Sequence, residues 1–252
     1  MSSNFYERIG DEYDLMTDAD ERAGRELPVI LDLLGLPSDS RILEIGCATG
    51  ALAAALGREG HEVIGLDPVG SFITMAKGRR DLPASVSFVQ AHFEEWFPHQ
   101  GEAFDAALCL GHTLPHLVAD RPVADVMRDI GETLRPGGQF LAQMVNPSLV
   151  EARGHWEPPA RTWERGGVRV TLRRRWIDRG DSLQLRITRI TDSDEGTAQR
   201  NWDQTLPKVR SEQIAEILRG DPWTDLRLLA DVAGNAFEKS SSPALVALAR
   251  RR

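Results

Sequence analysis

Five short apolar segments alternate with helical segments over the first 150 residues of this 252-residue chain. Each has the length and composition of a buried strand: residues 41–45, 62–66, 86–89, 104–109 and 139–144. Apolar spacing or Ala- and Leu-rich composition predicts the intervening helices: residues 4–36, 51–58, 71–80 and 123–134. Strands that alternate with helices pair in parallel through right-handed crossovers. The pattern therefore predicts an α/β fold with a doubly wound, mostly parallel sheet and helices on both faces.

The first predicted strand runs into a glycine-rich turn before a helix, in the segment Leu43-Glu44-Ile45-Gly46-Cys47-Ala48-Thr49-Gly50. Gly46 and Gly50 allow the backbone to approach a ligand closely, and the first N–H groups of the helix are free to donate. Asp67 ends the second strand, 17 residues after Gly50. A doubly wound fold places a carboxylate there to bind the two hydroxyls of a ribose. The spacing predicts a nucleoside-containing ligand at the carboxyl ends of the strands.

Two classes of nucleoside ligand compete for this turn. A nicotinamide dinucleotide requires the pattern G-x-G-x-x-G, but Ala48 and Ala51 replace the second and third glycines counted from Gly46. Glu44 would also place a negative charge beside a bound pyrophosphate. S-adenosylmethionine carries a sulfonium and an ammonium group and no phosphate, so the turn favours it. A nicotinamide oxidoreductase is the weaker alternative.

The same residues resemble the class I S-adenosylmethionine-dependent methyltransferases. The turn Glu44–Gly50 is similar to their first motif, Asp67 to their ribose-binding acid, and Phe72 to the apolar residue that packs on adenine. The segment 134–138 (Leu-Arg-Pro-Gly-Gly) resembles the turn before their fifth strand. The resemblance covers about the first 150 residues and, more loosely, residues 235–252. It implies a seven-stranded Rossmann-like sheet, S-adenosyl-L-methionine as the cofactor, no metal, and a small-molecule acceptor like that of the N-methyltransferase branch.

The resemblance also implies a set of cofactor-binding residues: Tyr13, Glu44, Gly46, Cys47, Ala48, Gly50, Asp67, Pro68, Phe72, His92, Phe93 and Leu110. Two positions depart from the usual pattern. Ala48 replaces the middle glycine of the turn, and His92 stands where the family usually has an Asp that accepts from the adenine amino group. The adenine contact is therefore open between His92 and backbone groups.

Three residues are candidates for catalysis: His112, His116 and Tyr13. Both histidines follow the fourth predicted strand, whose carboxyl end faces the ligand crevice in such a fold. An imidazole with an ordinary pKa of about 6.5 accepts a proton from a hydroxyl or an ammonium group. His116 resembles a histidine of small-molecule amine methyltransferases, and the alternative for either histidine is a hydrogen bond to the backbone.

Tyr6 and Tyr13 are the only tyrosines, and both lie in the N-terminal segment. In the resembling family this segment folds over the cofactor as a cap. A tyrosine there can hydrogen-bond the methionine carboxylate or an amine substrate. The alternative is an amphipathic helix whose tyrosines bury their rings and leave their hydroxyls in water.

The formal charge changes sign along the chain. Residues 1–150 hold 11 Lys+Arg and 23 Asp+Glu, a net of −12, whereas residues 151–219 hold 14 and 11, a net of +3. Alternating polar and apolar residues at 168–173 and 183–188 predict an antiparallel hairpin. The hairpin arginines line mostly one face, which is either solvated or attractive to an anionic acceptor: Arg169, Arg173, Arg175, Arg186 and Arg189.

These patterns predict four parts: an N-terminal helical cap (1–40), a cofactor-binding core (41–150), an antiparallel β insertion (151–210) and a C-terminal completion of the core sheet (211–252). The insertion would act as a lid or as an arm that pairs two copies into a homodimer.

We therefore predict a methyltransferase that transfers a methyl group to a small molecule, at an amine nitrogen before a hydroxyl. The alternatives are O- or C-methylation of a natural product or metabolite, and a cofactor-binding protein without methyl transfer. The net charge of −8, together with Leu-Gly-His-Thr in place of an N-P-P-[YFW] signature, disfavours a nucleic-acid substrate. No apolar run approaches the roughly 18 residues of a membrane span, and two cysteines fit a reducing compartment, so a cytoplasmic location is expected.

Overall fold

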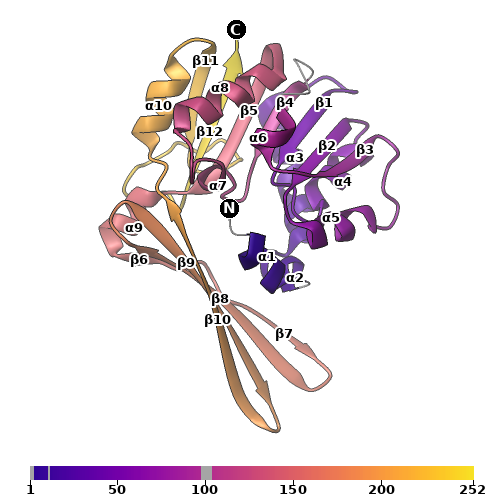
Figure 1. Ribbon diagram of the computed structural model, residues 1–252, viewed down its shortest axis with the longest axis vertical. Helices are drawn as coiled ribbons and strands as arrows, with labels where there is room; N and C mark the ends of the chain where they lie inside the picture. The colour runs from indigo at the N-terminus through magenta and orange to yellow at the C-terminus, as the bar shows by residue number, and fades with distance from the viewer. Residues whose placement is uncertain (1–2, 11, 98–103) are drawn as a thin grey trace. The chain divides into compact units, whose positions relative to one another are not determined.

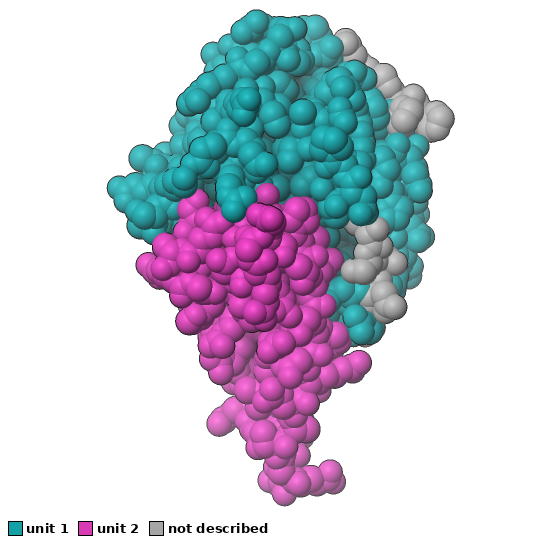
Figure 2. All heavy atoms as spheres, turned by 60° about the vertical axis from the view of Figure 1, so that its left-hand side comes forward, with its two compact units in different colours: residues 1–146, 209–252 teal, residues 147–208 magenta. Residues whose placement is uncertain are grey.

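The computed structural model describes residues 3–10, 12–97 and 104–252 (Figure 1). The chain divides into two compact units, residues 1–146 with 209–252 and residues 147–208, which Figure 2 colours separately. Among the described residues, no helix is both long and apolar enough to cross a membrane.

The first unit contains a seven-stranded sheet of order β11-β12-β5-β4-β1-β2-β3 within the described residues. Its strands are β1 (Arg41–Ile45), β2 (Glu62–Asp67), β3 (Val86–Gln90), β4 (Phe104–Cys109), β5 (Leu134–Val145), β11 (Trp223–Leu229) and β12 (Ala244–Arg251). Neighbours from β3 to β5 pair in parallel, and β12 pairs antiparallel with both β5 and β11. The predicted doubly wound, mostly parallel sheet is confirmed.

Helices cover both faces of this sheet (Figure 1). They are α3 (Ala19–Leu34), α4 (Ala51–Arg58), α5 (Gly70–Lys77), α6 (Phe93–Trp96), α7 (Leu114–Leu117), α8 (Val123–Thr133) and α10 (Ser211–Arg219). Two buried apolar clusters fill the space between helices and strands. Ile30 of α3 and Leu56 of α4 belong to one cluster, while Ile130 of α8 and Leu218 of α10 belong to the other. Burial of apolar side chains on both sides of the sheet is the main stabilisation of this fold.

Residues 4–36 are mostly helical, as predicted, and within the described residues they form three helices. These are α1 (Ser3–Ile9), α2 (Glu12–Thr17) and α3. Gly10, with φ 53°, follows α1, and Asp18, with φ 56°, lies between α2 and α3. A left-handed backbone cannot continue a right-handed helix, so each of these residues interrupts the helical path. The separate directions of α1 and α2 place two tyrosines near the sheet edge that carries the glycine turn.

The second unit is an antiparallel sheet of order β10-β9-β8-β6, with β7 also paired to β8. Its elements are α9 (Pro147–Arg153), β6 (His155–Trp156), β7 (Arg161–Arg165), β8 (Val168–Asp178), β9 (Ser182–Ser193) and β10 (Gly196–Pro207). The predicted antiparallel insertion is confirmed. Its predicted row of arginines is engaged by carboxylates, since Arg186 pairs with Asp203 and both Arg173 and Arg175 pair with Glu157.

Candidate active site

The turn between β1 and α4 adopts a left-handed backbone at Gly46, Ala48 and Gly50, with φ of 75°, 47° and 75°. A Cβ atom at Gly46 would lie 2.5 Å from the Thr113 side chain, and one at Gly50 would lie 2.4 Å from the Phe88 ring. Both glycines are therefore required by space as well as by conformation. The N–H of Gly46 donates to the Leu66 carbonyl at 2.7 Å, which ties the turn to β2.

Asp67, at the end of β2, joins the glycine turn to the turn between β2 and α5. Its Oδ2 accepts the Ala48 N–H and its Oδ1 accepts the Val69 N–H, each at 2.9 Å. Burial raises the pKa of Asp67 to about 6, against the opposing effect of these two donors. The carboxylate is thus fixed in direction beside the turn, and each oxygen has a further lone pair to accept a ligand hydroxyl.

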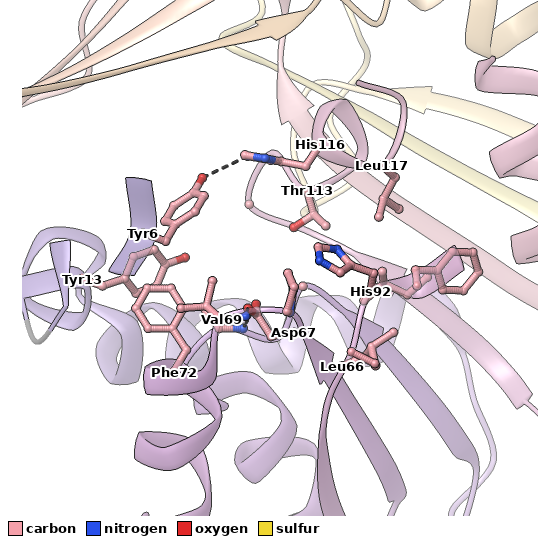
Figure 3. Close-up of a pocket in the computed structure, with 17 residues that line it drawn as sticks. Tyr6, Tyr13, Leu66, Asp67, Val69, Phe72, His92, Thr113, His116 and Leu117 are labelled. Atoms are coloured by element: carbon pink, nitrogen blue, oxygen red, sulfur yellow. Dashed lines mark hydrogen bonds between the residues drawn. The ribbon is translucent and has the colours of Figure 1, made fainter. Parts of the chain in front are cut away.

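A first pocket of about 710 Å³, a volume that includes its open mouth, lies above the carboxyl ends of β1, β2 and β3 (Figure 3). Its lining residues are Tyr6, Tyr13, Ile45, Gly46, Ala48, Leu66, Asp67, Pro68, Val69, Phe72, Ala91, His92, Phe93, Gly111, Thr113, His116 and Leu117. Figure 3 shows the rings of Tyr6, Tyr13 and Phe72 along one side of the space, with Asp67 and Val69 beside Phe72 and His116 across the space from Asp67. His92 also lines it, and the His92 Nδ1 is buried without a hydrogen-bond partner among the described residues. The pocket therefore has a wall of aromatic rings, with a carboxylate at one end and an imidazole at the other.

The Tyr6 hydroxyl lies 3.0 Å from the His116 Nε2 (Figure 3). Burial lowers the pKa of His116 to about 4 and raises the pKa of Tyr6 above its usual value. The imidazole is therefore neutral and the phenol protonated at neutral pH, and the direction of their hydrogen bond depends on the imidazole tautomer: with the proton on Nδ1, the hydroxyl donates and the Nε2 accepts. His116 thus presents a neutral imidazole to the first pocket.

Tyr13 packs against Phe72 with ring centroids 4.7 Å apart and lines both this pocket and a second one. Burial raises the pKa of Tyr13 to about 12, so its hydroxyl is protonated at neutral pH. The Tyr6 ring lies 6.0 Å from Phe72. The N-terminal helices therefore supply two aromatic rings to the site.

His112 takes a different place from His116. The Val145 N–H donates to the His112 Nδ1 at 3.1 Å, and His112 lines neither of the two pockets. Burial lowers the pKa of His112 to about 3. The structure thus separates the two predicted histidines, holding His112 against the β5 backbone and bringing His116 into the pocket.

A second pocket of about 490 Å³ adjoins the first, since Tyr13, Gly46, Ala48 and Gly111 line both. Its other lining residues are Thr17, Ala19, Arg22, Ala23, Glu26, Glu44, Cys47, Thr49, Ala51, Leu52 and Leu110. Burial raises the pKa of Cys47, so it presents a protonated thiol. Of the cofactor residues inferred from resemblance, only Gly50 lines neither pocket, because it lies at the start of α4 behind the turn.

Glu44 and Arg22 are two ionisable side chains that line the second pocket. Glu44 is 7% exposed, and its buried Oε2 has no hydrogen-bond partner among the described residues. Burial raises the pKa of Glu44 to about 8, and the nearby Arg22 opposes that shift. Arg22 itself donates to Glu26 and, at 3.3 Å, to Gln143. A buried carboxylate and a guanidinium in one pocket complement the ammonium and carboxylate of an amino acid.

The sequence prediction omitted Arg22 and gave no role in the site to Thr113. Arg22 lies beside Ala23 and Leu27, two apolar residues that α3 buries. Its position at the margin of an apolar helical stripe is the sequence feature that could have predicted a role for Arg22 in the site. Thr113 gave no comparable signal, because its place depends on the close approach of Gly46.

A family profile described as "Methyltransferase domain" matches residues 42–138. That segment begins in β1, ends within β5, and includes the glycine turn, Asp67 and His116. The chain carries a methyltransferase domain. The fold is the class I Rossmann-like fold, as the sequence resemblance predicted, and proteins of this family use S-adenosylmethionine.

Curated relatives match this domain over part of their length. The ubiquinone biosynthesis O-methyltransferase of Azorhizobium caulinodans is 34% identical over 110 residues, which cover 43% of this chain and 42% of that protein. The putative methyltransferase YqeM of Bacillus subtilis is 27% identical over 106 residues, 42% of each chain. The match thus spans less than half the length of these relatives.

Solved structures share the fold of this methyltransferase-domain protein over nearly its whole length. The CcbJ methyltransferase of Streptomyces caelestis superposes with a TM-score of 0.74 at 21% identity, covering 96% of each chain. The amino pentose methyltransferase CalS10 of Micromonospora echinaspora, solved with S-adenosylmethionine bound, gives 0.69 at 17% identity over 93% of this chain and 92% of its own. The sugar N-methyltransferase KedS8 of Streptoalloteichus gives 0.68 at 19% identity, over 96% and 94%.

Proposed function

We propose that this chain transfers a methyl group from S-adenosylmethionine to an amine nitrogen of a small molecule. The observation that carries the proposal is the first pocket, which holds the His116 imidazole together with the carboxylate of Asp67. One side of that pocket suits a nucleoside and the other side suits a proton-releasing acceptor. Two structural neighbours bear names that specify an amino sugar or N-methylation, which supports nitrogen as the target.

The residues present fit the two ends of the cofactor. Asp67 would accept the ribose hydroxyls, Phe72 would pack on the adenine ring, and the buried His92 Nδ1 would accept a hydrogen bond from the adenine amino group. In the second pocket, the unsatisfied Glu44 Oε2 would accept the ammonium group and Arg22 would bind the carboxylate. The residues shared by both pockets would hold the sulfonium, which supplies the methyl group as an electrophile when the cofactor is bound.

His116 would receive the proton of the acceptor. As the bond from nitrogen to the methyl carbon forms and the sulfur–carbon bond breaks, the nitrogen becomes cationic and releases a proton. The His116 Nε2 accepts it, directly after the Tyr6 hydroxyl is displaced or through that hydroxyl, which gives its own proton to Nε2 as it takes the new one. Tyr6, Tyr13 and Thr113 would hold the acceptor in line with the methyl group, which accounts for much of the rate in such a transfer.

Methylation of a hydroxyl is the second candidate, because the relative with 34% identity is an O-methyltransferase. The two candidates differ in how they depend on the base. A neutral amine attacks before it loses its proton, whereas a hydroxyl must give up its proton as it attacks. Loss of His116 would therefore reduce O-methylation more than N-methylation.

A panel assay tests the proposal. The purified chain is incubated with S-adenosylmethionine and with amino sugars, aliphatic amines, phenols and catechols, and mass spectrometry detects methylated products and S-adenosylhomocysteine. We expect methylated amino sugars or amines as the main products. Methylation of phenols alone would show that the acceptor is a hydroxyl and not an amine. Cofactor binding without any methylated product would favour a protein that binds the cofactor but transfers no methyl group.

A further inference from the structure

Arg79, just beyond the end of α5, contacts three separate segments of the first unit. Its Nε donates to the Thr49 carbonyl at 2.5 Å, and its Nη1 donates to the Asp20 carboxylate at 2.5 Å. Its Nη2 lies 3.4 Å from the Thr49 hydroxyl and 3.7 Å from the Asp14 carboxylate. The Arg79 side chain is only 14% exposed. One guanidinium therefore joins α2, α3 and the glycine turn.

The Thr49 hydroxyl closes this network. It donates to the Asp14 Oδ1 at 2.5 Å, and Thr49 is 2% exposed. Asp14 is adjacent to Tyr13, whose ring lines both pockets. The contacts that hold the turn thus also hold the helix that carries an aromatic wall of the site.

The cap formed by α1 and α2 depends on such contacts. Its helices have 7 and 6 residues, and helices this short are not stable by themselves in water. Other side-chain hydrogen bonds from the cap to the core include the exposed pair of Ser71 with Glu7 and the bond between Tyr6 and His116. Charge-assisted bonds from a largely buried guanidinium are stronger than an exposed pair.

We infer that Arg79 is a positioning residue that latches α2 onto the glycine turn and so controls how fast the cofactor leaves. Arg79 lines neither pocket of the site, so it acts through Asp14 and Thr49. The inference rests on the proposed function, because it assumes that S-adenosylmethionine or its product occupies these two pockets. Opening of α2 then becomes the step that precedes cofactor release.

Arg79→Met tests the latch, and Arg80→Met is its matched control. Arg80 is the next residue, is exposed, and makes no ion pair or hydrogen bond among the described residues. Two quantities are measured: hydrogen exchange of α1 and α2 in the free protein, and the dissociation rate of S-adenosylhomocysteine. For Arg79→Met we expect both to rise, the dissociation rate by roughly 10- to 100-fold. Arg80→Met should stay within about twofold of the unmodified chain for both, as expected of a surface change.

The rate of methyl transfer at saturating cofactor distinguishes a latch from a general loss of structure. It should change by less than threefold, an order-of-magnitude limit for a residue that does not touch the reacting atoms. Arg79→Lys should raise the exchange of α2 and the dissociation rate less than Arg79→Met does. Lysine keeps the positive charge but lacks the forked guanidinium that reaches Thr49 and Asp20 together.

Equal exchange of α2 and equal dissociation rates in Arg79→Met and Arg80→Met would overturn the inference. If Arg79→Met does not fold, Asp14→Asn replaces it, because it removes one charged partner of Arg79 while keeping the side-chain shape. If the unmodified chain binds no S-adenosylhomocysteine, the proposed function fails. The exchange comparison would still decide whether Arg79 holds the cap.

Discussion

Charged side chains in the two units of this chain follow opposite rules. At the edge of the first sheet, Glu44 and Asp67 are buried, and burial raises the pKa of Glu44 to about 8 and of Asp67 to about 6. On the second sheet, Arg186 holds the exposed Asp203, and arginines lower the pKa of both Asp203 and Glu157. The buried carboxylates of the first sheet can accept further hydrogen bonds, whereas the exposed carboxylates of the second sheet already pair with arginines.

This contrast shows where a ligand is to be expected. A buried carboxylate oxygen without a donor costs folding free energy, and such groups concentrate where a ligand supplies the missing partner. Exposed pairs contribute little and offer little to a ligand. The net positive charge of residues 151–219 therefore gives little support to an anionic acceptor there, because four of its arginines are engaged by acids of the same unit: Arg169, Arg173, Arg175 and Arg186.

The largest effect is expected at His116. His116→Asn removes the proton acceptor, and general-base contributions predict a loss of roughly 100- to 1000-fold in the rate of transfer to a hydroxyl, with a smaller loss for a neutral amine. Cofactor affinity, measured by calorimetry, should change little, because His116 lies on the acceptor side of the pocket. His155→Asn, at an exposed position in β6, is the control. An unchanged rate in His116→Asn would remove its proposed role.

Lys208 differs from the exposed ion pairs of the second unit, because it is a buried cation. Its side chain is 1% exposed and donates to both Glu151 and Asp178 at 2.7 Å. Lys208→Met would remove the buried ammonium group that two partly buried carboxylates share, a loss of about 3–5 kcal/mol in the free energy of unfolding. Urea denaturation measures it. A loss as small as that of an exposed pair would mean that burial does not decide the strength of charge pairs in this unit.

Glu44 predicts a pH dependence of cofactor affinity. A bound cation favours the ionised carboxylate, so affinity should rise as pH approaches 8, by up to about tenfold per pH unit, and level off above it. Glu44→Gln should flatten this profile. A profile that is equally steep in Glu44→Gln would show that another group is responsible.

The same shift has a consequence for the stability of the free protein. The unfolded chain loses its Glu44 proton near the ordinary value of 4.5, while the folded chain keeps it to about 8. Folding stability therefore falls as pH rises between these values, and Glu44→Gln should raise the melting temperature of the free protein at pH 8.

The smallest effect is expected at Arg186. Arg186→Met breaks an exposed pair with Asp203, so neither the melting temperature nor methyl transfer should change measurably. Thermal denaturation and the product assay check this. A clear loss of transfer would contradict the view that this face takes no part in the reaction.

The sequence predicts those features of the fold and the site that neighbouring residues encode. Short apolar runs and their spacing predict the core strands, the glycine turn and Asp67. A buried strand and the turn that follows it are encoded within a few residues. The contact of Tyr6 with His116 joins residues 110 positions apart, and Gln143 reaches Arg22 across 121. No local pattern encodes such pairs. The same limit explains why His112 and His116 looked equivalent, since the β5 backbone decides which of them faces the pocket.

Calorimetric titration of the free chain with S-adenosylmethionine tests the central claim most directly. The account predicts binding at one site per chain. It also predicts that Asp67→Ala, which removes the acceptor held by Ala48 and Val69, abolishes or greatly weakens that binding. No binding to the unmodified chain, or equal binding to Asp67→Ala, would contradict the assignment of these pockets to the cofactor.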